Sequence, residues 1–193
     1  LAICDFDTIN PILSNNRNVQ EISKIIFDSL VTLDEQYKIQ YCLAEEIAKA
    51  DDLNYIIKLK KGILWQDGNS FTAYDVQFTI DQIKRTLPEN GISTTYANNL
   101  SAISFLEVID ENTIKITLSA PVDFFEYNLT FPIMSQKYYE NEDFVHTEKN
   151  SKPVATGMFK IENVDSNVIK LVQNDLYWNS SKNPMAKEIN INC

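Results

Sequence analysis

The sequence predicts a protein of mixed α and β structure, and three observations support this class. In two segments, apolar residues recur at three- and four-residue steps, as on one face of a helix. In several others, apolar and polar residues alternate as in a strand. The chain has 193 residues, of which 44% are hydrophobic and 23% charged, a composition typical of a globular protein. We therefore expect a buried core, without internal repeats or low-complexity segments.

Two segments have the pattern of amphipathic helices. In residues 19–30, apolar side chains share one helical face, and Asn16 is suited to cap the amino end. Farther along, Thr72 and Asp75 have the spacing of a capping box, and apolar residues continue at helical spacing until Pro88. We expect the second helix to end there, followed by a turn at residues 88–91 and a loop at residues 93–99.

Alternation predicts strands at residues 54–59, a hairpin of residues 106–109 and 113–118, a second hairpin of residues 159–161 and 168–172, and a last strand at residues 187–192. In the first hairpin, Ile114, Ile116 and Leu118 are expected to face the core. Between the hairpins lies a dense aromatic cluster, which we interpret as core filling in preference to a ligand platform. Its members are Phe124, Phe125, Tyr127, Leu129 and Phe131.

Charge and composition exclude several classes of function. The net charge is -10, so a surface for the phosphates of nucleic acid is not expected. Four glycines, none in a Gly-rich loop, exclude nucleotide binding of that kind. No run of about 18 apolar residues is present, so no segment is expected to span a membrane. The chain begins without Met and without a visible signal peptide, and we expect that it has been trimmed.

Metal and disulfide sites are also disfavoured. His146 is the only histidine, in a polar stretch, and is expected to be an exposed loop residue. Cys4, Cys42 and Cys193 are odd in number and far apart, which favours small buried apolar residues over a disulfide framework. We therefore expect no metal site and no cofactor.

Catalytic patterns are weak throughout. His146 has no partner for nucleophilic catalysis, and no Gly-x-Ser-x-Gly motif occurs. Adjacent acids in polar or turn-like contexts are usually solvated and lack the apolar cleft that a general acid needs. These pairs are Glu45–Glu46, Asp51–Asp52 and Asp110–Glu111. The sequence therefore does not indicate an enzyme.

A series of short motifs is far more specific. Residues 42–46 read CLAEE, residues 53–68 LNYIIKLKKGILWQDG and residues 71–76 FTAYDV. This series resembles the oligopeptide- and dipeptide-binding proteins of ABC importers, the bacterial extracellular solute-binding proteins of family 5. Further matches in family order lie at residues 9–11, 26–30, 113–122, 155–159 and 176–178. Ile47 and Ser70 depart from the family pattern, which usually has Trp and often has Pro there.

The resemblance implies a fold and its division. We expect a partial lobe of the periplasmic-binding-protein type with an inserted α+β subdomain. Residues 1–27 and 138–193 would form part of the ligand-facing lobe I, and residues 28–137 the inserted subdomain. Family members are much longer, so the resemblance covers their amino-terminal portion, with the second lobe absent from this chain. Within the recognised motif, Trp65, Asp67 and Gly68 are expected to be structural residues in place of ligand contacts.

The function implied is the capture of extracytoplasmic peptides between two lobes and their delivery to the permease subunits of an ABC importer. Membrane attachment would come only from the permease or from a lipid anchor outside this chain. By position in the family, the ligand-binding residues would be Asn15, Asn16, Arg17, Tyr96, Phe131, Thr156 and Gly157. Arg17 is a candidate partner for a ligand carboxylate, because its planar fork matches one.

Two alternatives stay open at the level of sequence. The same fold could bind a nickel chelate or an oligosaccharide, although a single His146 makes direct metal ligation poor. From another class, a secreted glycoside hydrolase would need two carboxylates that converge in an apolar cleft. Perturbed carboxylate pKa values at a pocket would favour the hydrolase, and an open polar cleft would favour the binding protein.

Overall fold

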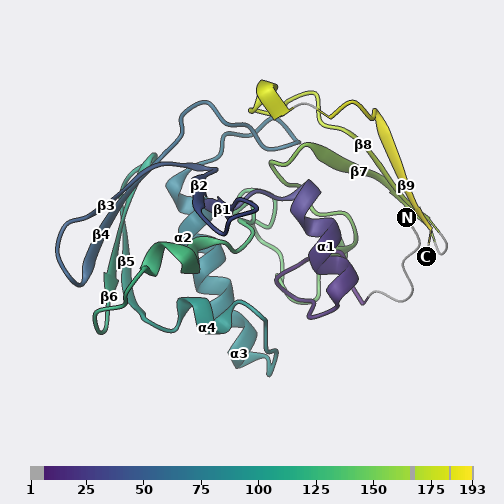
Figure 1. Cartoon of the computed structure of the whole chain (residues 1–193). Coiled ribbons are helices and arrows are strands. Elements are labelled where there is room, and N and C mark those ends of the chain that lie inside the picture. The colour runs from purple at the N-terminus through teal and green to yellow at the C-terminus, as the bar shows by residue number, and fades with distance from the viewer. Residues whose placement is uncertain (1–6, 166–167, 183, 193) are drawn as a thin grey trace.

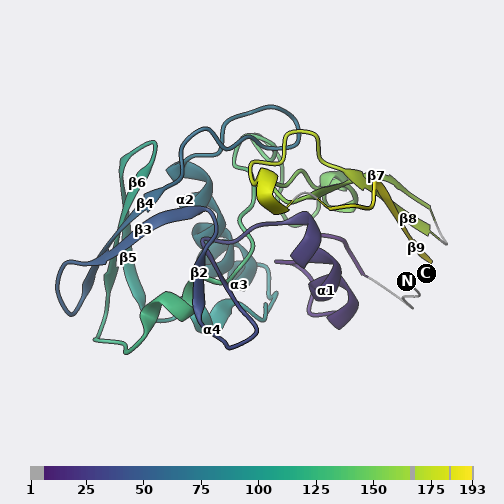
Figure 2. The ribbon, with the colours of Figure 1, turned by 45° about the horizontal axis from the view of Figure 1, so that its top comes forward.

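Two β-sheets stand at opposite ends of the molecule, with helices between them (Figure 1, Figure 2). The computed structural model describes residues 7–165, 168–182 and 184–192. In these residues one antiparallel sheet has the order β3-β4-β6-β5, another has the order β7-β8-β9, and β1 and β2 form a separate pair. The structure is therefore of mixed α and β class, as predicted. The strands are β1 (Val31–Leu33), β2 (Ile39–Tyr41), β3 (Ala44–Lys49), β4 (Asn54–Leu59), β5 (Ile103–Asp110), β6 (Thr113–Leu118), β7 (Phe159–Val164), β8 (Val168–Gln173) and β9 (Glu188–Asn192).

The helical elements are short. No helix in the described ranges combines the length and apolar character that a membrane span needs. The α-helices are α1 (Arg17–Ile26), α2 (Ala73–Asp81), α3 (Leu87–Glu89) and α4 (Ala97–Leu100). A π-helical turn spans Gln82–Thr86, and 3-10 turns span Phe125–Leu129, Glu148–Ser151 and Ser180–Lys182.

The first predicted helix exists as α1, but it is shifted toward the amino terminus. Asn16 caps it as expected, because its side chain accepts a hydrogen bond from the Asn18 amide at 2.8 Å. The helix ends at Ile26, since Phe27 is already extended, with φ -111° and ψ 145°. Leu30 is fully buried, but it lies in extended chain, where its carbonyl accepts from the Cys42 amide at 3.0 Å. Its apolar spacing therefore reflects burial and not a helical turn.

The second predicted helix passes the proline that was expected to end it. α2 continues through the π-helical turn into α3, which ends at Glu89. Pro88 lies in the first turn of α3, where its missing N–H costs little. The predicted loop at residues 93–99 also holds the start of α4. The predicted end of the helix at Pro88 and the predicted loop at residues 93–99 were therefore wrong, while the helix itself was predicted correctly.

The four-stranded sheet turns one apolar face toward α2 (Figure 1). β4 and the β5–β6 hairpin were predicted, and Ile114, Ile116 and Leu118 are at most 2% exposed. β5 begins at Ile103, three residues before the predicted start. β3 was not predicted as a strand, because its exposed charged residues hide the alternation. Charges on an edge strand discourage pairing with other chains.

The aromatic segment divides between the core and the surface. Phe125, Leu129 and Phe131 are fully buried, which confirms the prediction of core filling for these three. Phe124 and Tyr127 are 77% and 39% exposed, so for them the prediction was wrong. The physical reason is the left-handed backbone at Phe124, which begins a 3-10 turn in place of a strand or α-helix.

The carboxyl-terminal sheet has the predicted strands. β7 pairs with β8, and β8 pairs with β9. Residues 166 and 167 of the predicted turn lie outside the described residues. The four-stranded sheet falls within residues 28–137 and the three-stranded sheet within residues 138–193, while the division into a lobe and an inserted subdomain stays a prediction.

A buried carboxyl group joins the recognised turn to the core. Asp75 is 3% exposed, and its Oδ2 accepts from the Thr72 amide at 2.8 Å and from Trp65 Nε1 at 3.2 Å. Its Oδ1 accepts from the Gln136 amide at 2.8 Å. Burial raises the pKa of Asp75 to about 6, and these hydrogen bonds oppose that rise. Trp65 is fully buried, and Gly68 holds the turn with φ +87°, so their expected structural roles are confirmed.

We predict that Asp75→Asn lowers the free energy of unfolding by about 1–3 kcal/mol, because the amide NH₂ must face a donor that the carboxylate accepted. Urea unfolding followed by circular dichroism measures the change. Asp81→Asn, at a half-exposed position on the same helix, is the control and should cost less than about 0.5 kcal/mol. Equal unfolding free energies for the two variants would contradict the role of Asp75.

Candidate functional site

The predicted ligand-binding residues gather around one helix, α1, although the sequence separates them by up to 142 positions, from Asn15 to Gly157. One group begins the helix, Tyr96 contacts its first turns, and Thr156 and Gly157 lie against its carboxyl end. In Figure 1 α1 lies beside β7 of the three-stranded sheet.

At the amino end of α1, two of the predicted residues are occupied in holding the loop. Asn16 is the N-cap, and its own amide donates to Ser14 Oγ at 3.0 Å. Asn15 Nδ2 donates to the Ser93 carbonyl at 2.9 Å and so joins this loop to the segment of Tyr96. Arg17 is exposed, and among the described residues its guanidinium forms no ion pair. Arg17 is therefore the group at this end that is available to a ligand.

Tyr96 reaches α1 through Gln20. Both hydrogens of Gln20 Nε2 are committed, to the Pro11 carbonyl at 2.8 Å and to the Ser14 carbonyl at 2.7 Å. Gln20 Oε1 then faces the Tyr96 hydroxyl, which donates its proton to it. Burial raises the pKa of Tyr96 to about 12, so the phenol stays protonated. The lone pairs of this hydroxyl are left as hydrogen-bond acceptors.

A groove of about 610 Å³ runs along α1 beside Tyr96. One wall is the solvent-facing side of α1. The others are the residues between α1 and β1, the strand β1 itself, and Thr130 and Pro132 on either side of Phe131. The lining residues are Gln20, Glu21, Ser23, Lys24, Phe27, Asp28, Ser29, Val31, Thr32, Leu33, Tyr96, Thr130 and Pro132.

Asp28 closes the carboxyl end of α1. Its Oδ2 accepts from Thr156 Oγ1 at 3.0 Å and from Trp178 Nε1 at 2.8 Å. Its Oδ1 accepts from Cys42 Sγ at 3.5 Å. Burial, together with the Asp28 charge, raises the pKa of Cys42 to about 12, so Cys42 is an inert buried thiol, as predicted. Cys4 and Cys193 lie outside the described residues.

Gly157 lies in contact with the helix backbone. Its amide donates to the Ile26 carbonyl at 2.8 Å, and its carbonyl accepts from Asn174 Nδ2 at 2.8 Å. A Cβ at this position would be only 2.4 Å from the Ile26 carbonyl oxygen. The glycine is therefore required by the close approach of two backbones.

Phe131 and Thr156 present almost no surface. Phe131 is fully buried, while its neighbours Thr130 and Pro132 line the groove. Thr156 is 1% exposed, and its hydroxyl is bonded to Asp28. Of the seven predicted residues, only Tyr96 lines the groove directly. Arg17 is exposed outside this lining, and the other five hold the loops, the helix or the core around the groove. Ligand contact by all seven stays a prediction.

The chemistry available in the groove is hydrogen bonding. The carboxylate of Glu21 is paired with Lys24 at 2.8 Å, and this hydrogen bond lowers the pKa of Glu21. The carboxylate of Asp28 is bonded to three donors. Among the described residues, no group of three or more His, Cys, Asp or Glu side chains is placed to hold a metal ion. The remaining lining groups are amides, hydroxyls and apolar surface, which suit binding.

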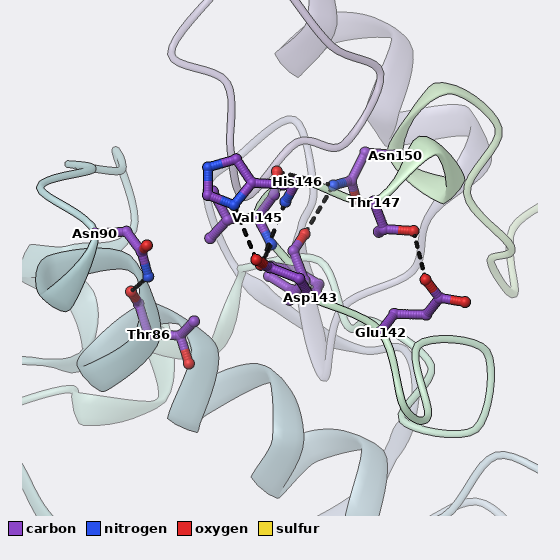
Figure 3. A network of polar contacts seen from close by, with 9 residues as sticks. Thr86, Asn90, Glu142, Asp143, Val145, His146, Thr147 and Asn150 are labelled. Atoms are coloured by element: carbon purple, nitrogen blue, oxygen red, sulfur yellow. Dashed lines mark hydrogen bonds and ion pairs between the residues drawn. The ribbon is translucent and has the colours of Figure 1, made fainter.

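The single histidine lies away from this groove, in the polar network of Figure 3. His146 Nδ1 is 3.0 Å from Asp143 Oδ2, and both side chains are more than 60% exposed. In the same loop, Thr147 Oγ1 donates to Glu142 Oε2 at 2.9 Å. Asn150 Nδ2 donates to the Phe144 carbonyl at 2.7 Å, which anchors the loop to the interior. His146 is thus an exposed loop residue, as predicted. The three acidic pairs named above are exposed as well.

Sequence reasoning missed most of the groove lining. Gln20, Lys24 and Thr32 are polar residues on surface elements, where a sequence gives no reason to distinguish a groove wall from ordinary solvent exposure. The one available signal was the amphipathic pattern of α1. That pattern identified the buried face, and the groove is on the other side.

We predict that Gly157→Ala lowers the free energy of unfolding by about 3 kcal/mol, because the added methyl group pushes the segment before β7 away from the Ile26 carbonyl. Gly91→Ala is the matched control. Gly91 has φ +71° and open space around it, so that variant measures backbone strain alone, about 1 kcal/mol. Urea unfolding compares the two, and a cost for Gly157→Ala no greater than that for Gly91→Ala would contradict the close approach.

Known proteins are similar to this chain in both sequence and fold. It is 30% identical over 176 residues to the glutathione-binding protein GsiB of Escherichia coli O1:K1, an alignment that covers 90% of this chain and 34% of the relative. NikZ of Campylobacter jejuni, solved with Ni(L-His), superposes with a TM-score of 0.84 at 25% identity and covers 99% of this chain and 38% of NikZ. DppA of Helicobacter pylori, solved with the peptide STSA, gives 0.84 at 25% identity, over 99% of this chain and 41% of DppA.

The chain thus spans about a third of the length of GsiB, at 34%. The sequence model of the bacterial extracellular solute-binding proteins, family 5 (middle region), matches residues 38–193. This match covers most of the chain and agrees with the resemblance of its motifs. The chain belongs to the bacterial extracellular solute-binding proteins of family 5.

Proposed function

We propose that this chain is part of the substrate-binding component of an ABC importer, which captures extracytoplasmic peptides between two lobes. It is a binding protein and not an enzyme. The groove along α1 forms one wall of the ligand site, and the second lobe, outside these 193 residues, forms the other. The observation that carries the proposal is the lining of the groove. It offers amide and hydroxyl groups, while its two carboxylates, Glu21 and Asp28, already have hydrogen-bond partners.

The Tyr96 hydroxyl is the most specific group of this wall. Because its proton goes to Gln20, it offers only lone pairs to a ligand, and it therefore selects a donor. A peptide supplies such donors along its backbone and at its amino end. Arg17, exposed at the start of α1, would donate hydrogen bonds to a carboxylate of the same ligand, because its planar guanidinium matches that group.

The other five predicted residues support α1 or the groove wall without lining the groove. Asn15 and Asn16 fix the loop that presents Arg17, and Phe131 supports the wall between Thr130 and Pro132. Thr156 and Gly157 hold the carboxyl end of the helix. A ligand bound along α1 would thus be held by a helix that is fixed at both ends, which lowers the entropic cost of binding.

The partners and location follow from the same proposal. The complete protein works outside the cytoplasmic membrane, either in a periplasm or as a cell-surface lipoprotein with an anchor outside this chain. It delivers peptide to the permease subunits of the importer. The family name and the relatives GsiB and DppA support this assignment.

Two alternatives are less favoured. NikZ carries a nickel–histidine complex in a similar fold, which keeps a nickel chelate as an arm of the test, together with an oligosaccharide. A glycoside hydrolase needs two carboxyl groups that converge on a sugar. In the groove, the hydrogen bond from Lys24 lowers the pKa of the exposed Glu21, where a general acid needs a raised pKa. Asp28 already accepts hydrogen bonds from Thr156, Trp178 and Cys42.

The direct test is thermal unfolding of the complete protein with a panel of peptides, a nickel–histidine complex and an oligosaccharide. A ligand that binds the native state raises the melting temperature, and the rise grows with the logarithm of the ligand concentration divided by its Kd. The proposal expects a rise with at least one peptide. A rise with the nickel complex or the sugar alone would overturn the assignment of peptide as ligand.

We predict that Tyr96→Phe weakens peptide binding roughly tenfold, because one hydrogen bond to a ligand donor is lost. Isothermal titration with the peptide identified by the panel measures the change. Tyr74→Phe, at an exposed tyrosine on α2 outside the groove, is the matched control. Unchanged affinity in Tyr96→Phe would show that the hydroxyl does not contact the ligand.

We also predict that Arg17→Ala weakens binding of a peptide with a free carboxyl end roughly tenfold and leaves its carboxamide unaffected. The same titration, with Arg85→Ala on the far helix as control, measures this difference. Equal losses for the acid and the amide of the peptide would exclude a carboxylate contact.

A further inference from the structure

The surface carries a second unusual feature, an exposed aromatic pair at the 3-10 turn after β6. Phe124 is 77% exposed and Tyr127 39%, and their rings stand nearly perpendicular, with centroids 6.2 Å apart. Neither residue lines the groove along α1. Ordinary surfaces expose apolar side chains singly, so two adjacent exposed rings at one turn need an explanation.

The backbone holds this pair outward. Phe125 is fully buried, with its ring 4.9 Å from that of Tyr55, and thus anchors the turn in the core. Phe124, directly before it, has φ 55° and ψ 38°, a left-handed conformation that costs a non-glycine residue about 1–2 kcal/mol. The Tyr127 amide donates to the Phe124 carbonyl at 3.0 Å and closes the turn. A fold that needed only the core contact of Phe125 would not need an exposed phenylalanine in this conformation.

The charges around the pair are mostly negative. Asp123 and Glu126 flank Phe124 in sequence, and among the described residues neither forms an ion pair. Burial raises the pKa of Tyr55, and the charge of Glu126 raises it further. Lys49 lowers this pKa, while Asp52 and Asp123 each raise it by smaller amounts. These three carboxylates therefore lie within electrostatic range of one hydroxyl. The nearby cation, Lys49, is ion-paired with Asp52 at 2.8 Å and also lies within electrostatic range of Asp123, so one ammonium group stands against three carboxylates around Tyr55.

We propose that the Phe124–Tyr127 pair, with Asp123 and Glu126, is a docking surface for an arginine-bearing segment of a partner protein. Aromatic faces attract a guanidinium through their quadrupole, and carboxylates bond its edge. Among cationic side chains, the planar, weakly hydrated guanidinium suits stacking on exposed rings best. The negative charge and the exposed rings together therefore favour an arginine side chain as the bound group.

The exposure of the rings favours a macromolecule over a small cation. A ring that is 77% exposed encloses nothing, and small ligands bind in concave sites that bury most of their surface. A protein segment that lies across the turn can cover both rings at once. The proposal does not depend on what binds in the groove along α1.

Fluorescence anisotropy of the labelled peptide Ac-GRGRGRG-amide, titrated with the chain at low ionic strength, tests the proposal. The glutamine counterpart Ac-GQGQGQG-amide is the control probe. We expect the arginine peptide to bind at least tenfold more tightly than the glutamine peptide, since only the guanidinium is recognised. Equal binding of the two peptides would overturn the proposal.

Protein variants separate this surface from attraction to the net charge. The double variant Phe124→Ser/Tyr127→Ser keeps the charge of -10 and should weaken arginine-peptide binding at least fivefold. Asp123→Asn/Glu126→Gln, which leaves both rings in place, should weaken it as well. Phe105→Ser, at a residue 61% exposed on β5, is the matched control and should bind as the wild type does.

Two results would contradict the proposal. If Phe124→Ser/Tyr127→Ser binds the arginine peptide as tightly as the wild type, the attraction comes from overall charge. If sedimentation shows that the wild type self-associates through this turn and that the double variant is monomeric, the occupant is a second copy of the chain.

Discussion

The carboxylate of Asp28 is the interaction on which the arrangement around α1 depends. It lies just beyond the helix and accepts hydrogen bonds from Thr156, Trp178 and Cys42, three segments far apart in the chain. Lys60 joins the same cluster, with its ammonium 4.6 Å from the centre of the Trp178 ring and hydrogen-bonded to the Tyr41 carbonyl. Asp28 is half-buried, and a carboxylate that is partly removed from water is stabilised when several donors compensate it, which favours the observed positions of these donors. The helix, the first strand pair and the carboxyl-terminal segment are thereby fixed to one another.

The groove follows from this constraint. With its carboxyl end held by Asp28 and by the Gly157 amide, and its amino end capped by Asn16, α1 can present its polar face as one wall. At the amino end Gln20 has a similar role. It donates both of its side-chain N–H groups to the loop before the helix, and its oxygen accepts from the Tyr96 hydroxyl. The groups that remain available are therefore few and held in defined positions, as in other sites that bind small ligands.

The sequence predicted the elements better than their edges, and the family better than the site. Alternation and the Thr72–Asp75 capping box depend on neighbouring residues, so β4, the β5–β6 hairpin and α2 could be predicted. The end of α1 involves a contact with the distant Gly157, which no local pattern contains. The passage through Pro88 follows a π-helical turn that the apolar spacing does not reveal, and the exposed charges of β3 hide its alternation. The same distinction explains the site. Tyr96 could be placed by resemblance, but Gln20, which fixes the proton of Tyr96, is recognisable only once the loop at Pro11 and Ser14 lies beside it.

The central claim, that the polar face of α1 is the wall of a peptide-binding site, can be measured directly. Hydrogen–deuterium exchange of the complete protein, with and without saturating peptide, reports which backbone segments the ligand protects. We expect protection at residues 17–33, which hold α1 and β1, and at residues 93–100, the segment of Tyr96. Protection confined to other segments, with these two unchanged by a peptide that binds, would contradict it.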